Sequence, residues 1–175
     1  MKLKICLAAA AFAVGGIPVA HAVTPPPNFP DLTNFDVVTA SHQVNYQRGT
    51  QQMVTFSTPD GVRCSIYAFG GVGSAVRCYG AIPGLQAQQV GTDVNAKSPC
   101  GFGMAQLHAA TPGVLSSYQG DCPSDLDGAA LLTPGQKVRM ATTICGVAPG
   151  EVTACIDSTD GGHGFVLQPS GSWTF

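Results

Sequence analysis

The chain has 175 residues, of which only 10% are charged, and a net charge of −2. Proteins that bind nucleic acid or anionic membrane surfaces need clustered basic residues. The sequence contains no such cluster, so we expect neither as a partner. The length suits a single domain with one hydrophobic core.

The first segment, residues 1–22, has the form of a secretory signal peptide. Lys2 and Lys4 supply positive charge, residues 5–20 form an apolar stretch, and cleavage is expected between Ala22 and Val23. The apolar stretch is shorter than the roughly 20 residues that a membrane helix needs. We therefore expect a secreted protein, extracellular or in the cell envelope, with no membrane span after cleavage.

Residues 23–34 are rich in proline and predict an extended polyproline-type tether. From residue 35 onward, short runs rich in Val, Ile, Thr, Phe and Tyr alternate with Gly, Pro and Asp turns. These runs predict strands at 35–40, 53–57, 62–69, 75–82, 104–109, 114–119, 137–144, 152–156 and 164–168.

Residues 35–175 are accordingly predicted to form a single secreted β domain. The expected fold class is all-β, a small disulfide-stapled sandwich or barrel of about 8–10 short antiparallel strands. Residues 83–99 lack a clear period and predict a long loop, or a short helix within it.

Outside the signal peptide the chain has an even number of cysteines, which in an exported protein indicates a disulfide framework. They are Cys64, Cys78, Cys100, Cys122, Cys145 and Cys155. Six cysteines allow 15 pairings. The local turns favour Cys64 with Cys78 and Cys145 with Cys155, which leaves Cys100 with Cys122. No close cysteine pair indicates a metal site.

Motifs of common catalytic and cofactor sites, such as G-x-S-x-G, H-E-x-x-H and the P-loop, are missing, so no cofactor is expected. The one constellation with possible chemistry is Asp157, Asp160 and His163, which a turn between two strands could bring together as acid and base. The alternative interpretation is structural, because Asp and Gly at such a turn also serve hairpin geometry.

Other polar and aromatic residues carry weaker signals. His42 and His108 are single histidines without a partner that the sequence identifies. Trp173 and Phe175 predict an aromatic contact that fixes the last segment to the core, and an exposed aromatic that stacks on sugar is the alternative.

Several motifs resemble a known family. Residues 56–64 read F-S-T-P-D-G-V-R-C, residues 76–78 read V-R-C, and the end combines C-G at 145–146, V-T-A-C-I-D at 152–157 and G-H-G-F-V-L at 162–167. This pattern resembles small secreted, disulfide-containing actinobacterial proteins of mycobacterial type, a domain of unknown function. The resemblance implies the compartment and the disulfides, implies no activity, and includes His163.

The leading hypothesis is a secreted, monomeric, non-catalytic protein that binds an unknown protein or envelope component. One alternative is a secreted hydrolase that uses His163 with Asp157 or Asp160. Another is a structural envelope protein without a discrete ligand.

Overall fold

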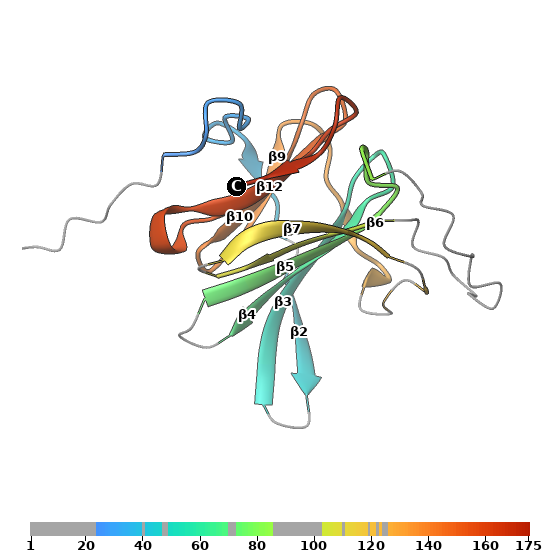
Figure 1. Cartoon of the computed structure of the whole chain (residues 1–175). Coiled ribbons are helices and arrows are strands. Elements are labelled where there is room, and N and C mark those ends of the chain that lie inside the picture. The colour runs from blue at the N-terminus through green and yellow to red at the C-terminus, as the bar shows by residue number, and fades with distance from the viewer. Residues whose placement is uncertain are drawn as a thin grey trace, which may run out of the picture.

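The computed structural model describes residues 24–39, 41–46, 49–69, 73–85, 103–109, 111–118, 120–121, 123 and 126–175. The expected signal peptide, its cleavage site at Ala22 and Val23, the pair Cys100 and Cys122, and most of the 83–99 loop lie outside these residues. The described chain is a β-sandwich with almost no helix, in which two sheets pack face to face (Figure 1). It contains no helix long and apolar enough to cross a membrane.

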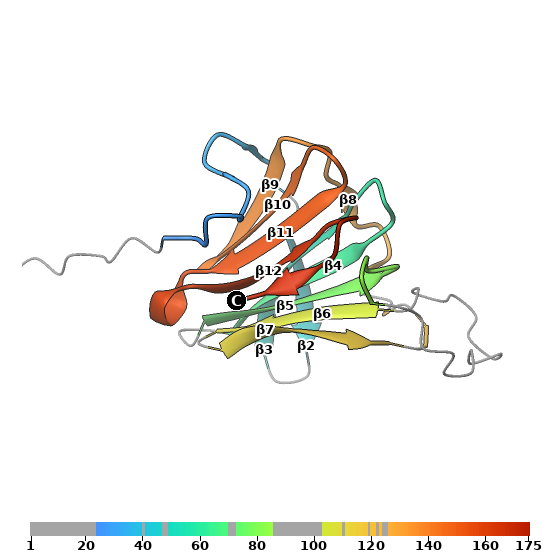
Figure 2. The same ribbon diagram turned by 45° about the horizontal axis from the view of Figure 1, so that its top comes forward.

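The first sheet has six strands in the order β1-β9-β10-β11-β12-β13, the group that lies uppermost in Figure 2. Their bounds are Asp36–Val37 (β1), Gln136–Met140 (β9), Thr143–Ala148 (β10), Val152–Asp157 (β11), His163–Leu167 (β12) and Trp173–Thr174 (β13). The second half of the chain therefore builds nearly all of this sheet.

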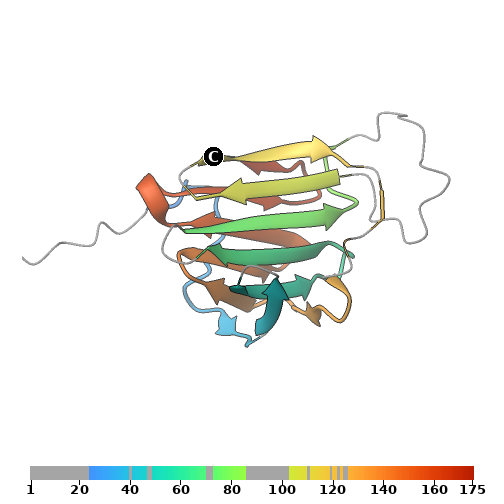
Figure 3. The same cartoon turned by 90° about the horizontal axis from the view of Figure 1, so that it is seen from below.

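The second sheet has seven strands, with β2 to β7 in sequence order and β8 beside β3 (Figure 3). Their bounds are Ser41–Tyr46 (β2), Gly49–Ser57 (β3), Arg63–Phe69 (β4), Gly73–Gly80 (β5), Gly103–His108 (β6), Thr111–Ser117 (β7) and Ala130–Leu131 (β8). Consecutive strands from β2 to β7 pair in antiparallel fashion.

The predicted all-β fold class is confirmed, with a sandwich in place of the barrel alternative. The strand number was too low, because the described residues alone form thirteen. The prediction of antiparallel strands also missed two parallel pairs, β1 with β9 and β3 with β8. Each of these pairs involves a two-residue strand, too short to give a periodic signal.

One predicted strand, 137–144, is in fact two strands. Met140 of β9 lies opposite Thr143 of β10, and the chain reverses over Ala141 and Thr142. Ala141 has a positive φ of 49°. Alanine seldom adopts this conformation. The turn contains none of the residues that usually indicate a turn, Gly, Asn or Pro, so the sequence did not predict it.

The core lies between the sheets and contains two disulfides. Cys64 of β4 is bonded to Cys78 of β5, and Cys145 of β10 is bonded to Cys155 of β11. Each pair occupies directly opposite positions on neighbouring strands, with Cα atoms 4.0 Å and 4.1 Å apart. These are the two hairpin pairs that the sequence analysis favoured. All four cysteines are fully buried, with Phe56 and Phe165 among the large side chains of the same core.

The Pro-rich segment, in its described part from residue 24, lies against the outer face of the six-stranded sheet. Leu32 is buried there, and the ring of Phe29 packs edge-on against Phe175 with centroids 5.6 Å apart. The expected tether is therefore a folded part of the domain over residues 24–34. Contacts with the far end of the chain hold it, and composition alone does not predict such contacts.

Candidate binding site

The outer face of the six-stranded sheet follows from strand alternation. Val138, Cys145 and Cys155 point into the core, so their neighbours Arg139, Ile144 and Ile156 point outward. In the register, Ile144 lies opposite both Arg139 and Ile156. These three side chains therefore form one continuous row across β9, β10 and β11. Arg139 is exposed, and both isoleucines are half-buried.

A parallel row on the same face is built from small residues. Gly146 of β10 lies opposite Ala154 of β11, and both are buried. A Cβ at Gly146 would lie 3.0 Å from Leu32 Cδ2 and 3.2 Å from Phe35 Cδ2. The small residues thus leave space in which the N-terminal segment packs, and the isoleucine row stays beside it.

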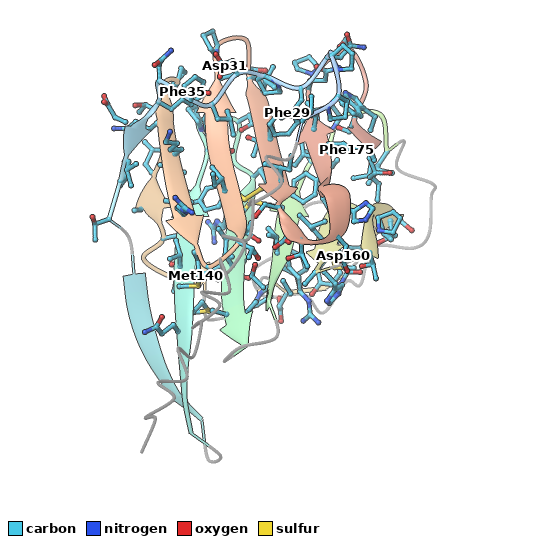
Figure 4. The ribbon with its side chains drawn as sticks, turned by 90° about the vertical axis from the view of Figure 1, so that its left-hand side faces the viewer. Phe29, Asp31, Phe35, Met140, Asp160 and Phe175 are labelled. Carbon is cyan, nitrogen blue, oxygen red and sulfur yellow. A yellow bond between two sulfur atoms is a disulfide. The ribbon has the colours of Figure 1, made fainter. Side chains whose placement is uncertain are left out.

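The N-terminal segment is fixed at two points. Lys137 of β9 donates hydrogen bonds from Nζ to the carbonyl oxygens of Leu32 at 2.7 Å and Thr33 at 2.9 Å. Nearer the middle of the segment, the Phe29 ring contacts Phe175, and the two rings lie beside each other in Figure 4. The segment therefore forms a wall across one end of the sheet.

Between this wall and the isoleucine row lies a cleft of about 720 Å³. Its volume falls in the usual range for small-molecule sites. The floor is aliphatic, the wall is formed by prolines and Phe29, and polar groups lie at the rim. The lining residues are Pro25, Pro26, Pro27, Phe29, Pro30, Asp31, Leu32, Thr33, Lys137, Arg139, Thr142, Ile144, Ile156 and Ser158.

The charges of the cleft are two cations, Lys137 and Arg139, and one carboxylate, Asp31. Hydrogen bonds from Thr33 lower the pKa of Asp31, and Lys137 lowers it further, so Asp31 is ionised at neutral pH. Lys137 is bound to backbone carbonyls. Among the described residues the side chain of Arg139 has no hydrogen bond or ion pair, so its guanidinium is available to a ligand.

The predicted acid–base residues lie elsewhere. Asp157 is 1% exposed and faces the core. Its Oδ2 accepts hydrogen bonds from the hydroxyls of Ser74 at 2.8 Å, Thr142 at 2.8 Å and Thr143 at 2.7 Å. Its Oδ1 accepts the backbone N–H of Thr159 at 2.8 Å. Burial alone would raise the pKa of Asp157, but the hydrogen bonds outweigh it and lower the pKa from 3.8 to about 2.

The structure brings His163 only partly into this group. His163 lies opposite Asp157 in the β11–β12 register, but no hydrogen bond or ion pair joins the two side chains. Asp160 is exposed in the 3-10 turn Thr159–Gly161, with a positive φ of 46°. Asp160 thus adopts the left-handed backbone conformation of the turn, while the hydrogen bonds of Asp157 hold the end of β11 in place.

The remaining predicted residues are placed as follows. His42 lies in β2, and its side chain is outside the described atoms. His108 is exposed at the end of β6. Phe175 packs against Phe29 of the N-terminal segment and against Trp173, with ring centroids 5.6 Å and 5.4 Å away, and Trp173 also lines a separate groove beside that segment. No group of three or more His, Cys, Asp or Glu suited to a metal occurs in the described part of the chain.

The sequence analysis missed the cleft. One signal was available, because the predicted alternation around Cys145 and Cys155 already places Ile144 and Ile156 on the outward face. Two outward isoleucines on neighbouring strands mark a surface that requires a cover or a ligand. No pattern in the sequence predicts that residues 24–34 lie over this surface.

Comparisons with known proteins found no family model that matches the chain, no similar curated protein and no similar solved structure.

Proposed function

We propose that this protein is a secreted, non-catalytic binding protein, located outside the cell or in the envelope, whose cleft beneath the N-terminal segment binds an aliphatic ligand with an anionic group. The signal-like residues 1–22 and the buried disulfides support the location, because structural disulfides persist in oxidising compartments. The likeness of the C-terminal motif to small secreted actinobacterial proteins belongs to the same proposal.

The observation that carries the proposal is the combination of an aliphatic floor and an available cation. Ile144 and Ile156 are half-buried with no polar group between them on the floor row, which favours a hydrocarbon chain. Arg139 directly follows Ile144 in the cross-strand register. A ligand lying along the row would therefore place its end at the guanidinium.

Charge complementarity specifies the ligand end. The cleft lining has an excess of positive charge, although the whole chain carries a net charge of −2. Guanidinium groups bind carboxylates and phosphates through paired hydrogen bonds. The hydroxyls of Thr142 and Ser158 lie at the same rim, but each donates its one hydrogen within the fold, to Asp157 Oδ2 and to the Thr142 carbonyl oxygen, so Arg139 is the group that binds the anion.

The geometry gives less support to a hydrolase built on His163. A general base requires a partner that orients it, and Asp157 accepts no hydrogen bond from the His163 side chain. Both Asp157 oxygens are already bound by other donors. Turnover of esterase, peptidase or glycosidase substrates that disappears in His163→Ala would favour the hydrolase over the binding protein.

The binding experiment uses decanoate as the probe, with decanol and decyltrimethylammonium as neutral and cationic analogues. Calorimetric titration and NMR of Ile methyl groups are expected to show saturable decanoate binding that shifts the Ile144 and Ile156 signals. Decanol is expected to bind more weakly, and the cation most weakly.

Two variants test the site. Arg139→Gln is expected to weaken decanoate binding roughly two- to fivefold, as for an exposed ion pair of up to ~1 kcal/mol. Arg77→Gln, on an exposed arginine of β5 in the other sheet, is the matched control and leaves the affinity unchanged. Absence of saturable binding, or equal effects of both variants, would contradict the proposal and leave the structural envelope protein as the better description.

A further inference from the structure

A second groove of about 510 Å³ shares Pro26 and Pro27 of the Pro-rich segment with the cleft. Its lining is Pro26, Pro27, Asn28, Gln168 and Trp173. None of these residues is charged, in contrast to the cleft with Lys137 and Arg139. The groove therefore suits a ligand of different chemistry from the aliphatic anion proposed above.

The residues of this groove come from two turns that the fold holds together. Gln168 and Trp173 flank the connection between β12 and β13, where Trp173 lies opposite Val166. Asn28 lies in a turn that is closed by a 2.9 Å hydrogen bond from Phe29 N to Pro26 O. The Phe29 and Phe175 rings fix this turn against the C-terminal residues, so the groove is preformed.

The polar groups of the groove are available. No hydrogen bond in the described part of the chain involves the indole N–H of Trp173 or the side-chain amides of Asn28 and Gln168. Trp173 and Gln168 are half-buried, and Asn28 is exposed. An indole ring and two free amides offer an apolar platform with donors and acceptors around it.

We infer that this groove binds a neutral saccharide, with a sugar ring stacked on Trp173 and its hydroxyls hydrogen-bonded by Asn28 and Gln168. A pyranose ring has an apolar C–H face that packs on an aromatic ring, and hydroxyls that both donate and accept. Side-chain amides also combine a donor and an acceptor, so each can pair with neighbouring hydroxyls. Without a charged lining residue, the groove favours neutral sugars over uronic acids.

The chain has one tryptophan, so intrinsic fluorescence reports directly on this groove. The experiment titrates the purified full chain with neutral oligosaccharides of glucose, mannose and N-acetylglucosamine, and with a uronic acid oligomer for comparison. A saturable change in Trp173 emission with at least one neutral sugar at up to millimolar concentration is expected. The uronic acid oligomer is expected to bind more weakly.

Asn28→Ala and Gln168→Ala are each expected to weaken sugar binding several-fold, because each removes one amide while the emission of Trp173 is kept. Both positions are in turns, so the fold should tolerate the changes, which circular dichroism checks. Trp173→Phe, followed by calorimetry, should retain weaker binding because a smaller ring remains. Emission that no neutral sugar changes, or affinities that neither amide variant alters, would overturn the inference. Because decanoate binding is measured at a different cleft, that result would leave the proposed function intact.

Discussion

The Asp157 carboxylate links the two sheets through neutral donors. Ser74 belongs to β5 of the seven-stranded sheet, whereas Thr143 and Asp157 belong to neighbouring strands of the six-stranded sheet. The Ser74 hydroxyl also contacts the Thr143 hydroxyl at very short range. A buried carboxylate without a cation is stable only when its oxygens are hydrogen-bonded, and here four donors meet that requirement.

This arrangement gives the fold an acid-sensitive link. The pKa of Asp157 is lowered to about 2 in the folded chain, from 3.8 ordinarily. Because the folded pKa is the lower one, the stabilisation is complete above about pH 4 and is lost as the pH falls towards about 2. The loss is expected to be about 2 kcal/mol. Urea unfolding of the wild-type chain at a series of pH values measures it.

Asp157→Asn is expected to lower the free energy of unfolding by about 1–3 kcal/mol at neutral pH, because a neutral amide accepts fewer hydrogen bonds. The variant should also lose most of the acid dependence between about pH 4 and about pH 2. Asp160→Asn is the control, since Asp160 is exposed and asparagine tolerates its positive φ. An unchanged acid dependence in Asp157→Asn would show that other carboxylates control the effect.

Among single residues, the sequence identified Asp157 as a residue of interest and His163 as a neighbour, but it did not predict the donors that bind the Asp157 carboxylate. His163 is close in sequence, whereas Ser74 is 83 residues away. Serine and threonine are too common for their positions to reveal such a donor. Only the packing of the two sheets brings β5 against the end of β11.

Among the elements, the strands of the core were predictable because inward and outward residues alternate along them. The short strands β8 and β13 were not, since each has two residues and depends on a neighbour for its position. Strand β2, Ser41–Tyr46, was missed because its sequence, SHQVNY, is mostly polar. The cleft was unpredictable because its wall, residues 24–34, is held in place by Phe175 and Lys137, which are more than 100 residues away in the sequence.

The structure is closely packed around Gly113 of β7 and Gly164 of β12. A Cβ at Gly113 of β7 would lie 2.5 Å from the carbonyl oxygen of Gly164 of β12. A Cβ at Gly164 would lie 2.3 Å from the Cys155 carbonyl oxygen and 2.6 Å from Phe175 Cζ. Real Cβ atoms do not approach backbone so closely, so the strands must separate if either glycine gains a side chain.

Gly164→Ala is therefore expected to lower the free energy of unfolding by about 1–3 kcal/mol, as for an overpacked core site. Gly146→Ala is the matched comparison on the same sheet. Its Cβ would meet the ends of the Leu32 and Phe35 side chains, which can move, so a smaller loss is expected. Urea unfolding with the disulfides intact compares the two variants, and equal losses would argue against close packing of Gly164 against the Cys155 carbonyl and the Phe175 ring.

For the whole molecule, the N-terminal segment is the part that creates both proposed sites. Pro26 and Pro27 line the cleft and the saccharide groove alike. The core cluster between the sheets contains no residue from 24–34. The segment therefore completes both sites without contributing to this core, and a deletion can separate its role from that of the sandwich.

Deletion of residues 24–33 is expected to leave the sandwich and its described disulfides folded while removing both binding responses. The loss of the buried Leu32 side chain alone should cost about 1.5–3 kcal/mol. The outer row at Gly146 and Ala154 becomes exposed, so binding of a hydrophobic dye should increase, and Trp173 emission should shift to the red as its Pro26 and Pro27 neighbours are lost. Circular dichroism and urea unfolding test the fold, and the decanoate and oligosaccharide titrations test the sites. If the deleted chain bound decanoate as tightly as the full chain, the N-terminal wall would not be part of the ligand site. If it failed to fold, the segment would belong to the folding unit despite its place outside the core.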